Sequence, residues 1–313
     1  MRTIVGLDAF HPGPRRTAVA IGNFDGLHLG HRRILRALDR LSRQKKLRSL
    51  VLTFDPHPER VFGRTRTFMI QTIGQRLESL RRSGVDSVLV TGFNRGFSGL
   101  SPDEFVTTVL RDRLAAEAVV VGDNFRFGKD RAGTIKDLKT MGAAAGLTVR
   151  AVPPVNKNGR VISSSLIRGL LERGRVEEAG RYLGRPYAVG GRVVHGRRVG
   201  RSIGFPTANL RTENEILPKG VFITLVRVGR ALHPSVANVG VRPTFGRGGL
   251  SLETVLLDSD RNLYGRTLEV SFLKKLRSER KFSSPAALAR QISKDIETAR
   301  EYFRAQKRNK RPV

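Results

Sequence analysis

The stretch Gly22-Asn-Phe-Asp-Gly-Leu-His28-Leu-Gly-His31 decides the fold of the first half of the chain. A short apolar run over residues 18–22 predicts a strand before it, and the apolar spacing over residues 29–46 predicts a helix directly after it. Gly22 and Gly26 allow a tight turn that brings backbone amides close to a ligand. Unpaired N–H groups and the positive dipole end at the start of the helix favour phosphate. The stretch therefore predicts a strand–loop–helix unit that binds a phosphate group.

Two histidines stand at the start of this helix. His28 and His31 are three residues apart, so both imidazoles are expected on the same side of the first helical turn. There they can donate hydrogen bonds to phosphate oxygens and offset charge as a phosphorus centre is attacked. Two further interpretations stay open: a metal-binding pair, although no third ligand of matching spacing follows, and two ordinary polar histidines.

The alternation of strand and helix continues to about residue 155. It predicts further strands at residues 50–54, 87–91, 119–122 and 147–152, and further helices at residues 75–83, from Ser101 onwards, and at residues 132–145. Such alternation indicates an α/β domain, in which helices cover both faces of a parallel sheet. Ligands of these sheets lie at the carboxyl ends of the strands, where loops lead into helices.

The pattern changes near Tyr187. Short strands rich in Val, Gly and Thr then follow one another without long helices between them, which predicts an antiparallel β-barrel. These strands are expected at residues 191–194, 221–228, 235–239, 252–257 and 267–273. A last helix is predicted over residues 284–304, and residues 170–185 indicate a helical connection broken by glycine. We therefore expect one domain at residues 1–184 and a second at residues 185–313.

A second phosphate-binding candidate runs from His195 to Asn209. Its first part alternates glycine with arginine, and Gly196, Gly200 and Arg201 suit a flexible loop that folds over phosphates. Thr207 and Asn209, two residues apart in an extended segment, place a hydroxyl and an amide oxygen on one face. Such hard oxygen ligands suit Mg²⁺, which completes its shell with phosphates and waters. A basic turn without a ligand is the open alternative.

Composition excludes several classes of protein. The chain has 313 residues, no cysteine and a formal net charge of +31, and 45 of its 58 basic residues are arginine. The lack of cysteine excludes disulfides, cysteine-ligated zinc and thiol catalysis. No apolar run approaches the roughly 18 residues of a membrane span, and the N-terminus lacks the apolar core of a signal peptide, so we expect a cytoplasmic protein with no membrane partner. The basic residues are spread along the chain, which favours a solvated surface over a polyanionic partner.

Several segments of the first half resemble a known superfamily. The stretch from Gly22 to His31 resembles the G-x-F-D-x-x-H-x-G-H signature of nucleotidyltransferases, and residues 162–168 resemble their S-S-T-x-I-R motif, with Ser165 in place of threonine. Residues 53–58 and 121–128 resemble flavin-side segments of the bacterial adenylyltransferase that makes FAD. The resemblance implies catalytic roles for His28 and His31. It implies an ATP site of Gly22, Phe24, Asp25, His28, His31, Ser164 and Arg168, and an FMN site of Phe54, Pro56, Pro58 and Asn124.

The second half resembles another enzyme family. Residues 204–209, Gly-Phe-Pro-Thr-Ala-Asn, are similar to the hallmark of riboflavin kinases, and residues 238–245 are similar to that family's N-x-G-x-x-P-T-F segment. The resemblance implies that Glu253 is the catalytic base. It implies an ATP site of Gly196, Gly200, Arg201, Thr207 and Asn209, with Mg²⁺ on Thr207 and Asn209, and flavin contacts from Asn238, Arg277 and Phe282. Ser271 departs from the pattern, because many relatives carry glutamate in that strand.

Taken in order, these motifs span residues 19–282, and the chain resembles the bifunctional bacterial riboflavin kinase/FAD synthetase family. The resemblance implies a Rossmann-like nucleotidyltransferase domain, followed by an antiparallel riboflavin kinase barrel that ends in a helix. It also implies that riboflavin is phosphorylated to FMN, and FMN adenylylated to FAD, with ATP as co-substrate and Mg²⁺ as cofactor. Riboflavin, FMN, FAD and ATP are then the expected partners, and the oligomeric state is left open.

Two alternatives accompany this interpretation. The first is an FMN adenylyltransferase with a degenerate kinase half. The second is a basic nucleic-acid-binding protein on a nucleotidyltransferase scaffold, which would need a clustered basic face with interleaved aromatic side chains for stacking. Aromatic residues make up only 6% of the chain, tryptophan is absent, and no such cluster is visible in the sequence. The sequence therefore argues against a nucleic-acid partner.

Overall fold

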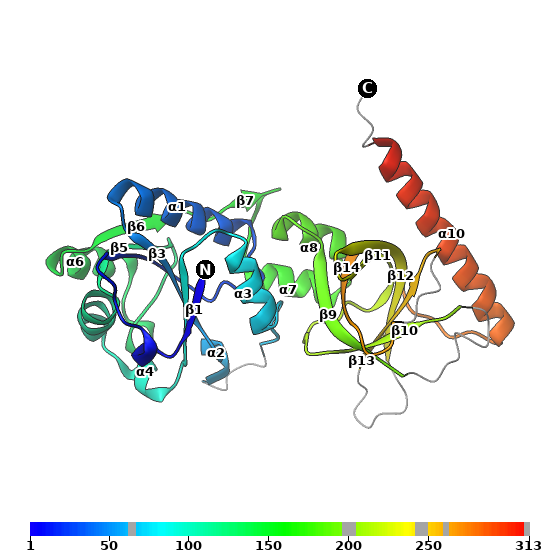
Figure 1. Ribbon diagram of the computed structural model, residues 1–313, viewed down its shortest axis with the longest axis horizontal. Helices are drawn as coiled ribbons and strands as arrows, with labels where there is room; N and C mark the ends of the chain where they lie inside the picture. Colours follow the sequence, from blue (N-terminus) through cyan, green and yellow to red (C-terminus); the bar gives the residue numbers. More distant parts are fainter. Residues whose placement is uncertain (62–66, 196–204, 242–249, 259–262, 310–313) are drawn as a thin grey trace. The chain divides into compact units, whose positions relative to one another are not determined.

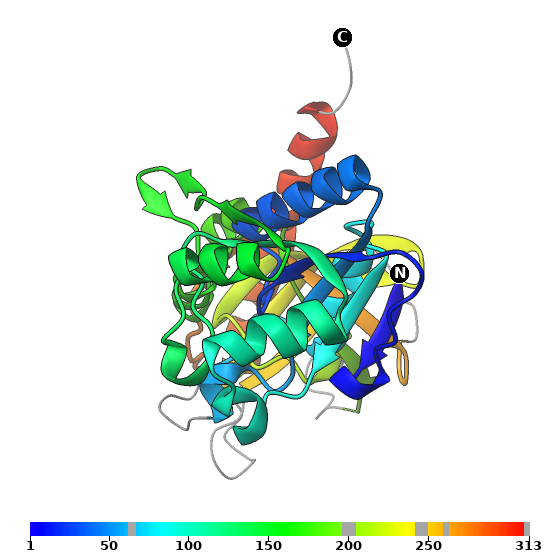
Figure 2. The ribbon, with the colours of Figure 1, turned by 90° about the vertical axis from the view of Figure 1, so that its left-hand side faces the viewer.

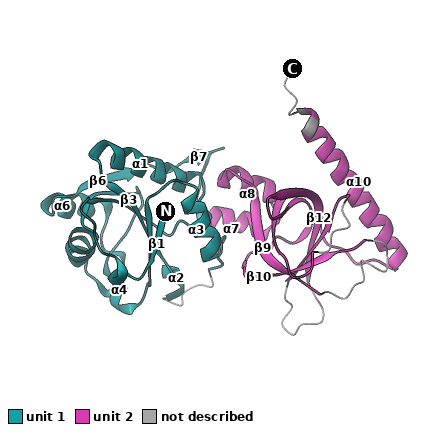
Figure 3. Ribbon diagram, in the orientation of Figure 1, with its two compact units in different colours: residues 1–164 teal, residues 165–313 magenta. Residues whose placement is uncertain are grey.

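The computed structural model describes residues 1–61, 67–195, 205–241, 250–258 and 263–309 (Figure 1). The chain divides into two compact units, residues 1–164 and 165–313 (Figure 3). Gly196, Gly200 and Arg201 of the expected ATP loop lie outside the described residues, as do residues 242–245 of the expected flavin segment.

The first unit is built on a six-stranded sheet in the order β1-β4-β3-β2-β5-β6, and all neighbouring strands in it run parallel. Its strands are β1 (Arg2–Val5), β2 (Thr17–Ile21), β3 (Arg48–Phe54), β4 (Ser87–Thr91), β5 (Ala116–Gly122) and β6 (Thr148–Val152). The predicted parallel α/β fold is confirmed. The sequence pattern does not predict β1, because only Ile4 of this edge strand is buried.

Helices cover both faces of this sheet (Figure 2). Successive side chains of a strand point to opposite faces, so Val51 of β3 enters one core with Leu80, and Leu52 enters the other with Leu138. The helices of the unit are η1 (Leu7–Ala9), α1 (Leu29–Lys45), α2 (Pro58–Val61), α3 (Ile73–Arg81), α4 (Arg95–Gly99), α5 (Pro102–Glu104), the π-helix η2 (Phe105–Arg113), η3 (Lys129–Arg131) and α6 (Ile135–Ala144). A small hairpin of β7 (Asn156–Lys157) and β8 (Arg160–Val161) follows β6.

Side-chain caps explain where these helices begin. The Thr72 hydroxyl accepts the N–H of Gln75, and the Gln75 side chain accepts the N–H of Thr72, a reciprocal pair that opens α3. Ser101 and Glu104 form the same arrangement at α5, with Pro102 in the first turn. The helix predicted from Ser101 onwards is therefore confirmed, with Ser101 as its N-cap.

Two short helices connect to the barrel, and all their residues except Ser164 belong to the second unit. They are α7 (Ser164–Glu172) and α8 (Val176–Leu183), and each is followed by a glycine with positive φ, Gly174 at 70° and Gly184 at 68°. A left-handed residue ends a helix, and glycine adopts that conformation without a Cβ clash. The expected helical connection with glycine breaks is therefore confirmed.

The rest of the second unit is a closed antiparallel barrel in the order β10-β13-β12-β11-β14-β9, with β9 pairing back onto β10. Its strands are β9 (Tyr187–Val194), β10 (Ala208–Thr212), β11 (Gly220–Val228), β12 (Ala231–Val241), β13 (Leu250–Leu256) and β14 (Thr267–Arg277). The predicted barrel is confirmed. Its interior is filled by buried side chains such as Phe222, Leu252 and Phe272.

The final helix, α10 (Pro285–Asn309), packs on the outer face of the barrel. Val221 and Val236 project outward from β11 and β12 and form one buried cluster with Ile296 and Ala299 of α10. Alternation along the strands sends their neighbours Phe222 and Ala237 into the barrel interior. None of the described helices combines the length and the apolar character that a membrane crossing requires.

Candidate active sites

The first candidate site lies where the strand order of the first unit reverses. From β2 the chain continues to β3 and β4 on one side, and then returns to place β5 and β6 on the other side. Residues 22–28 leave the carboxyl end of β2 at this reversal and lead into α1. Parallel sheets bind ligands at such a position, because neighbouring loops diverge there and leave a crevice.

His28 and His31 lie together at the start of α1. The N–H of His31 donates to Nδ1 of His28 at 3.3 Å, so His28 caps the helix with its own ring. The two ring centroids are 3.6 Å apart and the planes differ by 17°, which puts both imidazoles on one side, as their spacing predicts. Because Nδ1 of His28 accepts a hydrogen bond, the proton of the neutral ring belongs on Nε2, which is then a donor for an anionic ligand.

Two neighbours fix this histidine pair. Phe24 is fully buried, with φ 50°, and its ring meets that of His31 edge-on at a centroid distance of 5.2 Å. Gly30 lies against the other ring: a Cβ there would come within 3.0 Å of Cε1 and 3.1 Å of Nδ1 of His28. The absence of a side chain at residue 30 therefore leaves room for the His28 imidazole.

Asp25 holds the loop rather than facing solvent. Its carboxylate oxygens accept the N–H groups of Ile70 and Gln71, each at 3.1 Å, and only 1% of the residue is exposed. The hydroxyl of Ser164 donates to the carbonyl oxygen of Asp25 at 2.9 Å. Two residues of the expected ATP site are thus in direct contact. Arg168 lies one turn further along α7 than Ser164, in the second unit.

The expected flavin-side residues follow β3 and β5, the two strands that flank β2. Phe54 ends β3 and packs against the rings of Phe93 and Phe97 at centroid distances of 5.5 and 5.7 Å. Pro56 follows a cis peptide bond, and Pro58 begins α2. Asn124 lies in the turn after β5, so the topology brings all four expected FMN residues to the carboxyl edge that carries the histidine pair.

A buried arginine at this edge lies outside every sequence motif. Arg76 of α3 is 5% exposed, and its Nη1 donates to the carbonyl oxygen of Asn23 at 2.9 Å. Burial lowers the pKa of the Arg76 guanidinium, and the nearby carboxylates of Asp25 and Asp55 oppose that shift. The available signal was its position: Arg76 stands on the apolar stripe of its helix, between Ile73 and Leu80.

The second candidate site is a row of residues around the barrel. Asn209 of β10 lies opposite Glu253 of β13, and Glu253 lies opposite Asn238 of β12. The row continues through Val221 of β11 to Arg277 of β14. Directly opposed residues place their side chains on the same face, with Cβ atoms about 4.5–5.5 Å apart. Four residues that the sequence singled out separately therefore form one band across five strands.

This band lies on the outer face of the barrel. Asn238 opposes Val221, which packs on α10, so both side chains point outward. Asn209 is buried, whereas Glu253 and Asn238 are half-buried and reach the surface. Thr207 stands just before β10 and is also half-buried, two residues from Asn209. Along this row a carboxylate thus lies between two amides, and a hydroxyl stands two residues before Asn209.

This donor set fits a hard cation that also contacts phosphate. Thr207 and Asn209 supply neutral oxygen atoms, and the Glu253 carboxylate lies across from Asn209 in the neighbouring strand. Mg²⁺ is held in this way, by few protein oxygens together with phosphates and waters. In the described part of the chain, no three His, Asp or Glu side chains gather as an all-protein metal site would require.

Arg277 joins the barrel to α10. Its Nη2 donates to Oδ2 of Asp295 at 2.8 Å, and its Nε lies 3.0 and 3.2 Å from the two carboxylate oxygens. Gln291 donates to the same carboxylate at 2.8 Å. The Arg277 guanidinium carbon also stands 5.6 Å from the ring centroid of Phe282, the other expected flavin residue of this segment. The Arg277–Asp295 ion pair fixes the end of β14 and the start of the segment that leads to Phe282.

Replacement of Asp295 by alanine is expected to lower the free energy of unfolding by about 1–3 kcal/mol, because it leaves the Arg277 guanidinium, only 20% exposed, without its carboxylate. Urea unfolding of the full chain, followed by circular dichroism, measures this loss. Glu297→Ala on the same helix is the matched control, since Glu297 is 51% exposed and pairs with Arg300 at 3.5 Å. Equal losses in the two variants would contradict a structural role for the Arg277–Asp295 pair.

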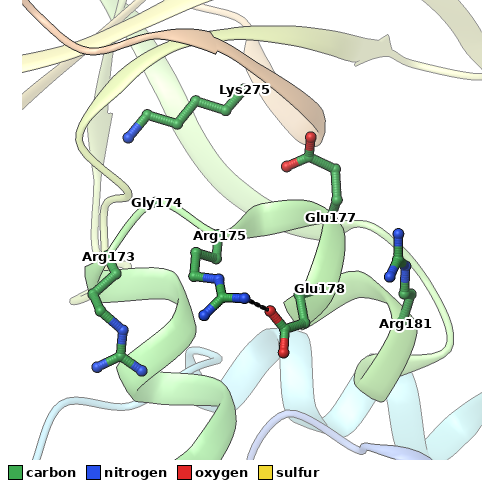
Figure 4. Close-up of a pocket in the computed structure, with 7 residues that line it drawn as sticks. All are labelled: Arg173, Gly174, Arg175, Glu177, Glu178, Arg181 and Lys275. Carbon is green, nitrogen blue, oxygen red and sulfur yellow. Dashed lines mark ion pairs between the residues drawn. The ribbon is translucent and has the colours of Figure 1, made fainter. Parts of the chain in front are cut away.

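A separate basic pocket lies beside α8 (Figure 4). It has a volume of about 390 Å³ and is lined by Arg173, Gly174, Arg175, Glu177, Glu178, Arg181 and Lys275. Arg175 forms an ion pair with Glu178, and the guanidinium groups of Arg173 and Arg181 lie at opposite ends of the pocket. The carboxylates of Glu177 and Glu178 lie among the basic side chains and neutralise part of their positive charge.

Comparison with known proteins follows the same division of the chain. Residues 11–166 match a family model described as FAD synthetase, and residues 183–303 match one described as riboflavin kinase. A bifunctional riboflavin kinase/FMN adenylyltransferase of Escherichia coli (strain K12) is 37% identical over 307 residues, 97% of this chain and 98% of that protein. A protein of Pseudomonas fluorescens with the same description is 38% identical over 302 residues, 96% of this chain and 97% of that protein.

A solved structure has the same fold over nearly the whole chain. It is described as a macrolide-efflux protein from Streptococcus pneumoniae and is 32% identical to this chain, with a TM-score of 0.89. The match covers 96% of this chain and 99% of that protein.

Proposed function

Because the chain belongs to the bifunctional riboflavin kinase/FMN adenylyltransferase family, we propose that its second unit phosphorylates riboflavin and its first unit joins the resulting FMN to the adenylyl group of ATP. The presence of two compact units supports two separate activities. The units divide between residues 164 and 165, whereas we place the functional boundary between residues 184 and 185, just before the first barrel strand. A cytoplasmic location, as expected from the sequence, is part of the same proposal.

The row Asn209–Glu253–Asn238 is the observation that carries the kinase assignment. The carboxylate of Glu253 accepts the proton of the ribityl 5′-hydroxyl as its oxygen attacks the γ-phosphorus of ATP and ADP leaves. Asn238, opposite Glu253 on the neighbouring strand β12, orients the flavin substrate. Arg277 and Phe282 complete the flavin side, and the ion pair to Asp295 keeps that segment in place.

Thr207 and Asn209 are the residues that would hold Mg²⁺. Their side chains offer a hydroxyl and an amide oxygen beside Glu253, a set that leaves most of the coordination shell to phosphate oxygens and water. When bound, the cation neutralises charge on the phosphates of ATP. Gly196, Gly200 and Arg201 belong to the same proposed ATP site.

The stacked imidazoles at the start of α1 carry the adenylyltransferase assignment. An FMN phosphate oxygen attacks the α-phosphorus of ATP, the bond to the β-phosphate breaks, and pyrophosphate leaves. His28 and His31 donate to oxygens that gain charge during this attack, and the helix N-terminus stabilises the same anion. Gly22, Phe24, Asp25, Ser164 and Arg168 form the remaining ATP site, and Phe54, Pro56, Pro58 and Asn124 receive FMN.

Product analysis tests the proposal as a whole. The purified chain is incubated with riboflavin, ATP and Mg²⁺, and the flavins are separated by chromatography over time. We expect FMN to appear first and FAD to follow, and we expect FAD directly when FMN is supplied. FAD from FMN without any FMN from riboflavin would instead indicate a degenerate kinase half. Failure to form either flavin would overturn the proposal.

Replacement of Gly30 by alanine is expected to lower the rate of FAD formation about three- to tenfold, because the added Cβ displaces the His28 ring by a few tenths of an ångström. Stability should be unchanged or higher, since alanine favours helix over glycine. Rates with supplied FMN, together with thermal unfolding, measure both effects. Gly74→Ala is the matched control, because its Cβ would approach nothing closer than 3.9 Å in the first turn of α3. Equal rates in the two variants would exclude a constraint on His28.

A further inference from the structure

We propose that Arg76 is a positioning residue of the adenylyltransferase site, which holds the loop after β2 through the carbonyl of Asn23. This inference rests on the function proposed for the first unit. Arg76 belongs to α3, outside every sequence motif discussed above, and its guanidinium is buried at the carboxyl edge of the sheet. It touches neither histidine in any described contact, so it acts through the loop that precedes them.

Asn23 is the point where three segments meet. Its carbonyl oxygen accepts a hydrogen bond from Nη1 of Arg76 at 2.9 Å and another from Oγ1 of Thr53 at 3.1 Å. Its side-chain amide hydrogen-bonds to Nε2 of His57 at 2.8 Å. Arg76 thus connects α3 to the loop of the histidine pair, and through Asn23 to the segment that carries Pro56 and Pro58.

The neighbouring residue of the loop is held by the same region of the chain. Asp25 accepts the N–H groups of Ile70 and Gln71, just before the cap of α3. The start of α3 and the segment before it therefore clamp the loop at two places, at residue 23 through a guanidinium and at residue 25 through a carboxylate. Between these clamps and α1 only residues 26 and 27 remain before the His28 ring, so their geometry sets where that ring begins.

The burial of the Arg76 guanidinium costs free energy that its few contacts offset only in part. Arg76 makes one hydrogen bond through Nη1, and its buried Nε donates to no acceptor among the described residues. Removing a guanidinium from water is costly, and an apolar side chain would fill the same space on the stripe of Ile73 and Leu80 more favourably. The carboxylates of Asp25 and Asp55 compensate part of the charge from nearby. The proposed reaction brings two anionic substrates to this edge, so a fixed positive charge beside the loop also favours their approach.

The test compares Arg76→Met, Arg76→Lys and Arg81→Met in the full chain. Methionine removes the donor and the charge but keeps an unbranched apolar side chain, and lysine restores the charge and one donor. Arg81 is the matched control on the same helix, because its side chain is 61% exposed and pairs with Glu78. FAD formation from supplied FMN and FMN formation from riboflavin are measured on the same samples, together with thermal unfolding.

We expect Arg76→Met to lower kcat for FAD formation about 10²-fold, with smaller changes in the KM values for ATP and FMN, because a misplaced loop affects the reacting geometry more than ground-state binding. Arg76→Lys should recover at least a third of the lost rate on a logarithmic scale, and FMN formation should be unchanged in every variant. Arg81→Met should match the parent chain in both reactions.

Three results would overturn the inference: a kcat for Arg76→Met within twofold of the parent, an equal loss of both reactions, or a loss in which lysine does no better than methionine. If Arg76→Met is unfolded at the assay temperature, the rate of Arg76→Lys, which keeps the buried charge, is compared with that of the parent chain instead. A kcat for Arg76→Lys equal to that of the parent chain would then support a role for the charge, and a loss as large as that of Arg76→Met would contradict it. Failure of the proposed function can be distinguished from failure of this inference. If the proposed function were wrong, the parent chain itself would form no FAD from FMN.

Discussion

Replacement of Glu253 by glutamine is expected to lower the rate of FMN formation about 10²–10⁴-fold, the usual contribution of a positioned general base. Glutamine keeps the size of the side chain and can fill the same place between Asn209 and Asn238, but its amide does not accept the proton of the attacking hydroxyl. The rate with riboflavin and ATP measures the effect, and FAD formation from supplied FMN should stay unchanged, because that reaction belongs to the other unit.

Glu269→Gln is the control for this prediction. Glu269 lies on β14 of the same barrel and pairs with Arg227 at 3.3 Å, with 38% of its side chain exposed, so the substitution removes a carboxylate away from the proposed site. Its FMN formation should equal that of the parent chain. If Glu253→Gln retained a near-parental rate, Glu253 could not be the base, and the proton would have to pass to water or to the phosphate itself.

The double variant His28→Asn, His31→Ala is expected to lose FAD formation by about 10²–10³-fold or more, because both donors to the charge developed at phosphorus disappear. Asparagine is chosen at residue 28 because it also caps a helix, so the start of α1 is kept while the imidazole is removed. The logarithmic losses of the two single variants should sum to more than the loss of the double variant, since groups that act as a unit are not additive.

FMN formation by the double variant provides the internal control, and it should remain at the parental rate. A second control is His11→Ala, since His11 is exposed and lies before β2, whereas the histidine pair follows the carboxyl end of that strand. Loss of both reactions in the double variant would argue against two separate sites. Retention of FAD formation would leave the helix N-terminus and the remaining ATP residues to stabilise the transition state without the imidazoles.

Much of the fold could be predicted from local patterns. The alternation of apolar strands and amphipathic helices gives the parallel sheet, and capping residues such as Ser101 mark where helices begin. The edge strand β1 could not be found, because its side chains are mostly exposed and carry no alternation. β10 could be predicted only as an extended segment at Thr207 and Asn209, because its five residues follow a Gly- and Arg-rich run that indicates a loop as readily as a strand.

The candidate sites were predictable as residues but not as geometry. The two histidines could be placed on one side from their spacing alone, since helical periodicity is local. The row from Asn209 to Arg277 depends on strand register, which pairs residues far apart in the sequence and has no local signature.

Buried charges were the largest omission. Arg76 and Asp295 both stand on the apolar stripe of their helices, where a charged residue contradicts the pattern of its neighbours. A charge at such a position has to find a partner in the interior or displace the helix. Arg76 finds the carbonyl of Asn23, and Asp295 finds Arg277. A stripe position that breaks the periodicity is therefore a usable sign of a polar contact.

The two units differ in how their sheets end. A closed barrel has no edge strands, whereas the parallel sheet ends at β1 and β6 with unpaired backbone groups that could template the addition of another chain. Arg2 and Arg150 are exposed on these two strands. Charged side chains on an edge oppose strand-to-strand association, and the net charge of +31 adds repulsion between whole molecules. Arg2 and Arg150 are thus two members of the arginine excess whose position opposes strand addition at the open edges of the first unit, apart from any substrate.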